Sequence, residues 1–287
     1  MRLLILGGGG MLGHRLVAHF EQRGDEVRAV LRRDAAAYGA PRLLRPDNTF
    51  AGVDLQDSAA LAGALESFAA DAVVNAAGIV LQRADAGDPA LNIEVNSLLP
   101  HRVAALCAAR GARFLHISTD CVFSGSKGAY REGDAPDPVD LYGRSKLLGE
   151  ACGAPAVTLR TSMIGLEIVH RHGLVEWFLA QKGPIKGFRR AVFSGLTTGE
   201  MCRAIECVLQ KSPAPHGLYH VSADPISKYD LLCGLRDALG LKTAIVPADE
   251  PVVDRSLDSS RFRGEFGYNP PGWPDMIERL AQELRQR

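Results

Sequence analysis

The fold is decided by the stretch MRLLILGGGGMLGHRLV at residues 1–17. Residues 2–6 are apolar enough for a buried strand, and residues 11–22 have the spacing of an amphipathic helix. Where a glycine-rich turn joins a strand to a helix, the first backbone N–H groups of the helix are unpaired and bind anions. This stretch therefore predicts a turn that holds the pyrophosphate of a dinucleotide.

The glycine run fits two registers of the dinucleotide motif. Either register brings a pyrophosphate close to the main chain, because glycine has no side chain to obstruct it. The registers are Gly8-x-Gly10-x-x-Gly13 and Gly7-x-x-Gly10-x-x-Gly13. The run alone leaves the choice open, and a glycine turn that binds nothing is the alternative interpretation.

The composition of the 287 residues narrows the class of partner. Lys plus Arg and Asp plus Glu each total 33, so no net charge favours nucleic acid or an anionic membrane, and we expect a small partner. The six cysteines lack the spacing of a zinc site, so we expect no metal and reduced thiols, mostly in the core. No apolar run is long enough to span a membrane, which predicts a cytoplasmic protein with neither nucleic acid nor membrane as partner.

Strand-like and helical segments alternate along the first half of the chain. This order predicts an α/β fold, a Rossmann-type doubly wound parallel sheet. The expected strands after the first are residues 26–31, 50–55, 72–77, 112–118 and 156–160. A long helix over residues 88–110 is expected to cover the centre of the sheet.

The second half is less regular and predicts a smaller C-terminal α/β substrate lobe. Its expected helices are 174–181, 198–210, 226–239 and 274–285, and its expected strands are 217–223 and 243–248. We expect the NADP-binding domain to cover residues 1–163, rejoined by about 191–222. The substrate lobe then comprises residues 164–190 and 223–287.

A candidate catalytic group follows the strand at 112–118. Tyr142 and Lys146 are four residues apart, so on a helix they share one face. A tyrosine has an ordinary pKa near 10, and the ammonium of Lys146 is placed to lower it. Thr119, or its neighbour Ser118, lies at the strand end where a hydroxyl could bind the same substrate oxygen, and we favour Thr119. An isolated Tyr-x-x-x-Lys is most often a packed tyrosine beside a surface lysine.

These motifs together resemble the extended short-chain dehydrogenase/reductases, and within them the dTDP-4-dehydrorhamnose reductase-like family with its RmlD substrate-binding domain. The resemblance covers nearly the whole chain. It rests on the Gly7 register, Asp54-Leu55, NAAG at 75–78, Asn96, STDCVF at 118–123, Tyr142-x-x-x-Lys146 and LRTS at 159–162.

The resemblance implies roles for particular residues. Thr119, Tyr142 and Lys146 are catalytic by this reading, and Asn96 either positions the active-site helix or caps a local kink. The implied cofactor-binding residues are Gly7, Gly10, Met11, Leu12, Gly13, Asp54, Leu55, Ala76, Ala77, Gly78, Asn96, Ser118, Tyr142 and Lys146.

Arg32 and Arg33 bear on the choice of cofactor. Two guanidinium groups after the second strand can bind the 2′-phosphate of NADPH through charge-assisted hydrogen bonds. Asp34 is adjacent, and solvated arginines that bind no phosphate are the alternative interpretation, so NADPH is favoured and NADH remains an alternative.

The triplet Thr119-Asp120-Cys121 bears on the reaction. Sugar-nucleotide 4,6-dehydratases resemble T-D-E at this place, and without that glutamate we expect reduction, with Tyr142 as proton donor. The resemblance implies NADPH-dependent reduction of the 4-keto group of a 4-keto-6-deoxy nucleotide sugar, for surface polysaccharide. One alternative is an epimerase-reductase in which Cys121 works with His170 or His172. The other is a non-catalytic NADP-binding regulatory protein.

The substrate lobe departs most from the family pattern, at residues 186–200 and at Met163, where relatives often carry tryptophan. Arg255 resembles the family's arginine segment and could bind the substrate diphosphate through its forked guanidinium. Arg189 or Arg190 is a weaker candidate for the same role. The partner is thus a nucleotide-diphosphate sugar, and a homodimer is left open.

Overall fold

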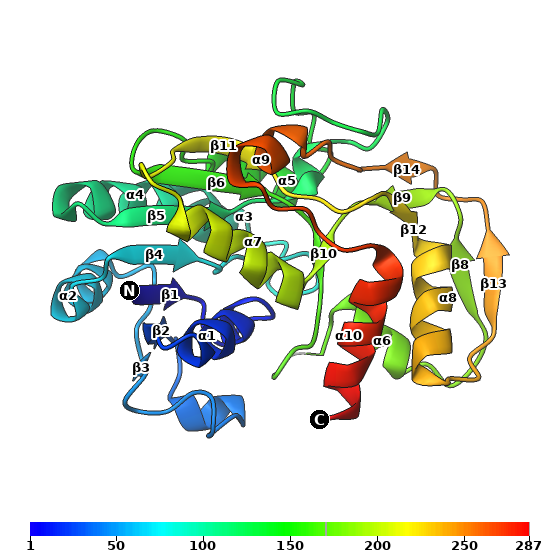
Figure 1. Ribbon diagram of the computed structural model, residues 1–287, viewed down its shortest axis with the longest axis horizontal. Helices are drawn as coiled ribbons and strands as arrows, with labels where there is room; N and C mark the ends of the chain where they lie inside the picture. The colour runs from blue at the N-terminus through cyan, green and yellow to red at the C-terminus, as the bar shows by residue number, and fades with distance from the viewer. Residues whose placement is uncertain (170, 287) are drawn as a thin grey trace.

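The computed structural model describes residues 1–169 and 171–286 (Figure 1). Its central sheet has seven parallel strands in the order β11-β6-β5-β4-β1-β2-β3. The strands are β1 (Arg2–Leu6), β2 (Glu26–Val30), β3 (Thr49–Phe50), β4 (Ala72–Asn75), β5 (Arg113–Ile117), β6 (Ala156–Arg160) and β11 (Gly217–His220). The chain order reverses at β1, which confirms the Rossmann-type sheet.

Helices cover both faces of this sheet. Because successive side chains of a strand point to opposite faces, Leu3 and Ile5 belong to one core and Leu4 and Leu6 to the other. The first core takes side chains from α1 (Gly13–Gln22) and α7 (Thr198–Gln210), and the second from α2 (Ser58–Phe68) and α4 (Leu99–Arg110). All strand residues Leu3 to Leu6 are fully buried, as a sheet covered on both faces requires.

A smaller lobe contributes the other wall of the molecule, on the right in Figure 1. Its helices and strands enclose a separate core around Phe178, Leu231 and Met276. They are α6 (Leu174–Leu179), α8 (Lys228–Leu239), α10 (Trp273–Arg285), β8 (Ile185–Phe188), β9 (Ala191–Phe193), β12 (Ile226–Ser227), β13 (Ile245–Ala248) and β14 (Val253–Asp254). Strand β9 pairs with β12 and β14, so residues 191–193 lie in this lobe.

Short elements complete the chain. They are η1 (Ala35–Tyr38), α3 (Pro89–Asn92), η2 (Ile93–Leu98), η3 (Asp120–Val122), α5 (Leu141–Leu148), β7 (Met163–Ile164), β10 (Leu196–Thr197) and α9 (Ser260–Phe266). The parallel pair of β7 and β10 lies where the chain passes between the central sheet and the smaller lobe.

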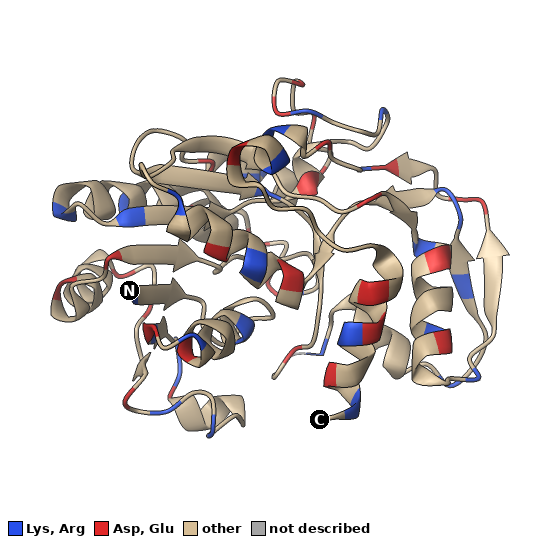
Figure 2. Cartoon of the chain, viewed as in Figure 1, with Lys and Arg blue, Asp and Glu red and all other residues tan. Residues whose placement is uncertain are grey.

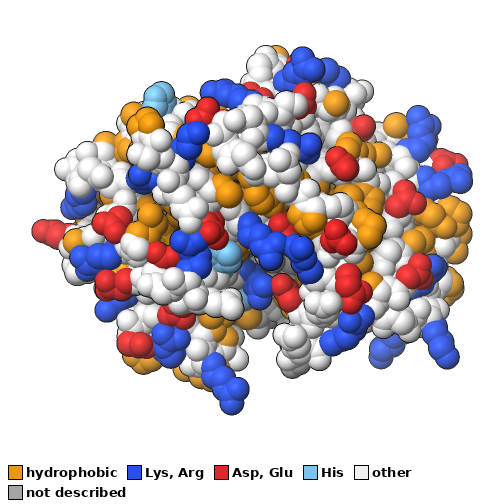
Figure 3. All heavy atoms as spheres, in the orientation of Figure 1, with side chains coloured by type: hydrophobic (Ala, Val, Ile, Leu, Met, Phe, Trp, Pro, Cys, Tyr) orange, Lys and Arg blue, Asp and Glu red, His pale blue; other side chains and the backbone are white. Residues whose placement is uncertain are grey.

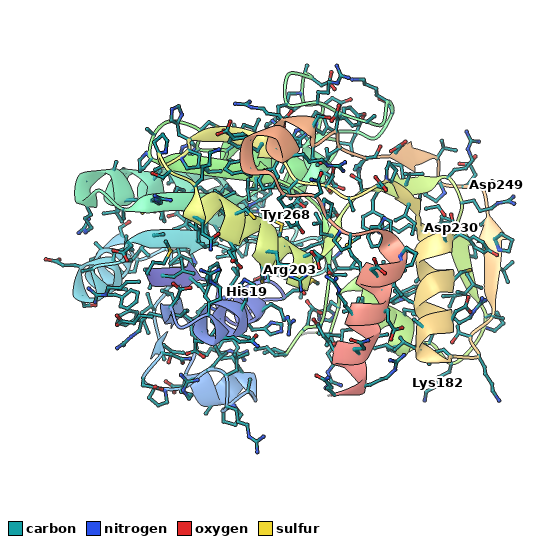
Figure 4. The ribbon with its side chains drawn as sticks, viewed as in Figure 1. His19, Lys182, Arg203, Asp230, Asp249 and Tyr268 are labelled. Atoms are coloured by element: carbon teal, nitrogen blue, oxygen red, sulfur yellow. The ribbon has the colours of Figure 1, made fainter. Side chains whose placement is uncertain are left out.

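A buried carboxylate ties the C-terminal segment to α7. Glu200 is 3% exposed and binds Arg203 at 2.7 Å and Arg279 of α10 at 2.5 Å. The hydroxyl of Tyr268 donates to the same carboxylate at 2.9 Å, and Figure 4 shows Tyr268 and Arg203 beside α7. Away from such pairs, basic and acidic side chains are interspersed over both lobes (Figures 2 and 3), in keeping with the zero net charge.

The expected strand at 50–55 is mostly wrong. β3 ends at Phe50, and Gly52 follows with φ of 72°, a left-handed conformation that turns the chain out of the sheet. Asp54 and Leu55 are consequently in the loop before α2.

The expected helix at 88–110 is present as one helical run of three consecutive segments. α3 leads into the π-helical η2, and α4 follows. Pro100 has no N–H to donate to the carbonyl of Asn96, four residues earlier, so the regular α-helical pattern cannot continue there. The long helix is therefore present but wound differently where it passes Asn96.

Only Cys107 and Cys202 are buried, so the expectation of mostly core cysteines is wrong for the other four, which are half-buried. All six are free thiols. Within residues 1–169 and 171–286, no helix combines the length and apolarity that a membrane span needs.

Candidate active site

A cavity of about 640 Å³ lies at the carboxyl ends of the parallel strands, between the sheet and the smaller lobe. Ligands of open α/β sheets bind at this edge, where the strand order reverses. The lining extends from the glycine turn to the smaller lobe and includes Gly7, Gly10, Tyr142, Lys146, Lys228 and Arg255.

The geometry of the glycine turn favours the register that begins at Gly7. Gly7 has φ of 78°, and a Cβ there would lie 2.8 Å from the backbone of Ala77, so only glycine fits. Gly10 lines the cavity beside Met11 and Leu12. Gly8 instead faces Ala29 in β2, while a Cβ on Gly13 would collide with the carbonyl of Gly7.

The start of α1 fits a phosphate group. Its N-cap residue is Leu12, and within the part of the chain that the structure describes this helix start has no side-chain capping hydrogen bond. Backbone N–H groups at such a helix start, together with the helix dipole, attract an anion. A glycine cradle and an uncapped helix start in one cavity together suit a dinucleotide pyrophosphate.

The part of the cavity lined by Arg32, Arg33 and Tyr38 is basic and aromatic. Arg32 and Arg33 line it and are exposed. Asp54 and Leu55, from the loop after β3, line it as well. The guanidinium of Arg33 lies 5.3 Å from the centre of the Tyr38 ring, a cation–π distance. The arrangement leaves both arginines accessible to a bound anion.

The loop after β4 is clamped by Asn96. Ala76, Ala77 and Gly78 line the cavity. The N–H of the next residue, Ile79, donates to Asn96 Oδ1 at 2.8 Å, and the Asn96 amide NH₂ donates to the carbonyl of Ile79 at 2.9 Å. The same amide donates to Ser145 Oγ of α5 at 3.1 Å. Asn96 is fully buried, so it positions the loop and α5 relative to each other.

Thr119, Tyr142 and Lys146 all line this cavity, and Ser118 lines it next to Thr119. Thr119 follows β5, while Tyr142 and Lys146 lie one turn apart on α5, whose first turn is capped by the Asp140 carboxylate at 2.7 Å from the Gly143 N–H. The three residues predicted from the sequence therefore line one cavity.

Two glycines let α5 approach its neighbours closely. A Cβ on Gly143 would collide with the carbonyl oxygen of Cys121, and one on Gly149 would collide with the carbonyl oxygen of Asn96. The helix that carries Tyr142 is therefore held between two backbone surfaces.

Burial dominates the electrostatics of the pair on α5. It raises the pKa of Tyr142, and the charges of Cys121 and Asp120 act in the same direction. Burial also lowers the pKa of Lys146 to about 7, although the Glu150 carboxylate opposes this. The expectation that Lys146 lowers the pKa of Tyr142 is therefore not met, because burial disfavours the charged forms of both side chains.

Lys146 has two polar neighbours inside the protein. Its Nζ donates to the carbonyl of Ile117 at 2.6 Å and lies 3.2 Å from His116 Nε2. His116 Nδ1 lies 3.1 Å from the Asn75 amide nitrogen. His116 and Asn75 are paired across β5 and β4 and are fully buried. Sequence reasoning missed both, although a polar side chain inside each apolar strand was the signal.

A buried ion pair supports the strand end beside this group. Arg160, at the end of β6, binds both oxygens of Glu150 at 2.8 and 2.7 Å. Ser118 Oγ donates to the same carboxylate at 2.8 Å. The guanidinium of Arg160 also lies 5.1 Å from the centre of the Phe123 ring.

Charged groups from distant segments, Asp120, Lys228 and Arg255, also line the cavity. Asp120 is buried, which raises its pKa, while Arg255 and Lys228 lower it. Lys228 comes from the first turn of α8, with its Nζ 4.3 Å from the centre of the Phe193 ring. Sequence reasoning missed Lys228, and its only signal was a lysine directly after the helix-capping Ser227.

The surroundings of Cys121 oppose a thiolate. Its Sγ lies 3.6 Å from Asp120 Oδ1 and 3.9 Å from Arg255 Nη1. Burial and the charge of Asp120 raise the pKa of the thiol to about 12. His172 lines the same cavity, whereas His170 lies outside the described residues.

Arg255 and Arg189 have different places. Arg255 lines the cavity, and its Nε donates to the carbonyl of Phe123 at 2.9 Å. Arg189 forms an exposed bidentate pair with Asp249 on the smaller lobe, at 2.9 and 2.8 Å. The neighbouring Arg190 is exposed as well.

Comparison with known proteins points to one family. A family model, the RmlD substrate binding domain, matches residues 1–286. The chain is similar to the spore coat polysaccharide biosynthesis protein SpsK of Bacillus subtilis, at 29% identity over 98% of this chain and 97% of that protein. It is also similar to the dTDP-4-dehydrorhamnose reductase of Aggregatibacter actinomycetemcomitans, at 25% identity over 97% and 98% of the two chains.

Two further similarities bear on the range of the family. Methionine adenosyltransferase 2 subunit beta of Bos taurus is 27% identical over 97% of this chain and 89% of that protein. Among solved structures, the dTDP-4-dehydrorhamnose reductase of Bacillus anthracis in complex with NADP has a TM-score of 0.80 at 18% identity, covering 98% of this chain and 99% of that one. The last similarity concerns the fold.

Proposed function

This chain belongs to the RmlD substrate binding domain family, and on that premise we propose that it catalyses the NADPH-dependent reduction of the 4-keto group of a 4-keto-6-deoxy nucleotide sugar. The observation that carries the proposal is that Thr119, Tyr142 and Lys146 line the same cavity as the glycine turn. The product would serve deoxysugar and surface polysaccharide synthesis, the process named for the relative SpsK.

The residues of the cavity fit a dinucleotide cofactor. Gly7, Gly10 and the start of α1 would hold its pyrophosphate, and Arg32 and Arg33 would hold a 2′-phosphate, which favours NADPH over NADH. A bound NADPH supplies the hydride that reduces the ketone carbon.

The protein's own chemical contribution is a proton and its placement. Tyr142 is uncharged at neutral pH because burial raises its pKa, so it can donate a proton to the oxygen of the reduced ketone. Thr119, which lines the same cavity, would bind the same oxygen. The Thr119-Asp120-Cys121 triplet lacks a glutamate at its third place, which supports reduction over dehydration.

Two cations suit the substrate's diphosphate. Arg255 and Lys228 reach the cavity from the smaller lobe and lie close enough to Asp120 to lower its pKa. A guanidinium and an ammonium on one wall give charge-assisted hydrogen bonds to phosphate oxygens. We assign them to the diphosphate of the nucleotide sugar.

The alternatives are less well supported. An epimerase-reductase needs Cys121 as a thiolate, which its burial beside Asp120 opposes. A non-catalytic NADP-binding protein would not need Thr119, Tyr142 and Lys146 assembled on one wall.

The test is a direct assay. The protein is mixed with NADPH and the dTDP, UDP or GDP form of a 4-keto-6-deoxy sugar, and both NADPH absorbance and the product's NMR spectrum are followed. We expect NADPH consumption and a new hydroxyl at carbon 4 with at least one of the three. Bound NADPH without turnover of any of them contradicts the proposal and supports the non-catalytic alternative.

We also propose that residues 1–163 with about 191–222 act as the cofactor domain, and the remainder as the substrate lobe. Strand β9 qualifies that boundary, since it pairs within the smaller lobe. A homodimer through η2 and α5 is proposed from the exposed apolar side chains Ile93 and Leu148. Six free thiols favour a cytoplasmic location.

A further inference from the structure

Asn75 has its side-chain direction fixed by the loop that follows it. The N–H of Ala77 can only donate, and it donates to Asn75 Oδ1 at 3.2 Å. The amide nitrogen of Asn75 must therefore face His116 Nδ1, 3.1 Å away. Since an amide NH₂ can only donate, His116 Nδ1 has to be the accepting nitrogen of the ring.

This contact decides where the ring proton of His116 lies. The ring is fully buried, and burial keeps its pKa well below the ordinary value, so it is neutral. A neutral imidazole carries one proton, and with Nδ1 accepting, that proton is on Nε2. The Nε2–H group then points at Lys146 Nζ, 3.2 Å away.

Because His116 Nε2–H is directed at Lys146 Nζ, it favours the uncharged amine form of Lys146 over the ammonium form. An uncharged amine has a lone pair that accepts from His116 Nε2–H, while its own N–H groups still donate to the carbonyl of Ile117 at 2.6 Å. An ammonium has no lone pair, so two donors would face each other. Protonating Lys146 would then require turning the Asn75 amide and giving up the Ala77 hydrogen bond.

The other ionisable groups around Lys146 and His116 do not supply an unpaired negative charge. Glu150, two residues past the end of α5, acts on Lys146, but its carboxylate is bound by Arg160 and Ser118. His101 of α4 acts on His116, and only as a further charge against protonation. Tyr142, on the same face of α5, is uncharged.

We propose that Asn75 and His116 are positioning residues that hold Lys146 as an uncharged amine in the free protein, by fixing the His116 ring as its Nε2–H tautomer. An uncharged Lys146 leaves Tyr142 without a cation that would favour its phenolate. The phenol then keeps the proton that reduction requires, so the inference rests on the proposed function for its purpose but not for its evidence.

The first experiment observes the tautomer. Two-bond ¹H–¹⁵N spectra of ¹⁵N-histidine protein distinguish a protonated ring nitrogen from a bare one, and the His116 signals are assigned by their loss in His116→Phe. At pH 8 we expect the Nε2–H form. A Nδ1–H or doubly protonated ring overturns the proposal.

Two variants show which residue sets the tautomer. In Lys146→Met the Nε2–H form should persist, because Asn75 determines it. In Asn75→Asp the carboxylate can accept from both the Ala77 N–H and His116 Nδ1, so the Nδ1–H form should replace it. A changed tautomer in Lys146→Met, or an unchanged one in folded Asn75→Asp, contradicts the proposal.

Stability then reports the charge of Lys146 without any activity measurement. Between pH 7 and 10, the unfolding equilibrium constant of the wild type should fall relative to that of Lys146→Met, by up to about tenfold per pH unit. In the Asn75→Asp background the same comparison should show little slope, because His116 Nε2 now accepts from an ammonium. Equal slopes in both backgrounds would overturn the coupling, whether or not the protein proves to be a reductase.

Discussion

Two buried basic side chains near the carboxyl edge of the sheet have opposite surroundings. Arg160 is held by both oxygens of Glu150, so its charge is fully paired inside the protein. Lys146 meets only the carbonyl of Ile117 and the His116 ring, within the residues described. A paired buried charge serves the structure, whereas a buried lysine without a bound carboxylate changes protonation easily and suits chemistry.

The largest expected effect tests the chemical role proposed for the residues on α5. Tyr142→Phe should lower kcat by about 10²- to 10⁴-fold, because the phenol acts on charge that develops on the substrate oxygen. NADPH affinity, measured by fluorescence titration, should be nearly unchanged. Turnover equal to that of the wild type would remove Tyr142 from the mechanism.

The next effect tests the structural role of the buried ion pair between Arg160 and Glu150. Glu150→Ala should destabilise the fold by about 3–5 kcal/mol in urea unfolding, because it leaves the Arg160 guanidinium buried without its partner. Lys146→Met is the matched control at the other buried cation, and it should be neutral or stabilising at pH 7. If Glu150→Ala were no more harmful than Lys146→Met, the two sites would not differ as described.

The cofactor end offers exposed cations for contrast. Replacing Arg32 and Arg33 together by alanine should weaken NADPH binding by about 1.5–3 kcal/mol for each charged hydrogen bond lost. NADH, which lacks the 2′-phosphate, should lose far less in the same calorimetric titration. Equal losses for both cofactors would assign the pair no part in phosphate recognition.

The pH dependence of stability sharpens the comparison further. Lys146 has a folded pKa near 7 against an ordinary 10.5, so the folded state binds fewer protons than the unfolded state in this interval. The cost of burying its charge is therefore complete below pH 7 and is relieved as pH rises. Relative to Lys146→Met, the wild-type free energy of unfolding should therefore increase by up to about 1.4 kcal/mol per pH unit between pH 7 and 10.5. A constant difference across the interval would mean that Lys146 stays charged.

The smallest effect concerns Arg189. Its pair with Asp249 is exposed, and such pairs contribute little to stability. Arg189→Ala should leave the melting temperature and the KM for the sugar substrate within error, whereas Arg255→Ala should raise that KM. A raised KM in Arg189→Ala would restore its place among the substrate-binding residues.

What the sequence predicted depended on how local the signal was. The glycine turn and the Tyr142-x-x-x-Lys146 spacing are short-range patterns, and the structure has both. The strand at 50–55 failed because the left-handed conformation of Gly52 overrides the apolar run around it. The winding of the long helix depends on one missing N–H at Pro100.

Residues that act across the fold were harder to predict. Lys228 reaches the cavity only because α8 begins beside β9, and no spacing in the sequence encodes that proximity. Asn75 and His116 were visible as polar residues in apolar strands, but their contact needs the register between β4 and β5. Local patterns therefore predicted the cofactor wall better than the substrate wall.

The tight seating of α5 limits how this protein can diverge. Any side chain at Gly143 or Gly149 would move the helix away from Cys121 or Asn96 and displace Tyr142, while every residue proposed as catalytic stayed in the sequence. One codon change at either glycine is thus a short route from an enzyme to a binding protein that keeps its glycine turn. In surveys of relatives, residues 143 and 149 are therefore a test of lost activity that a scan for the catalytic residues alone would overlook.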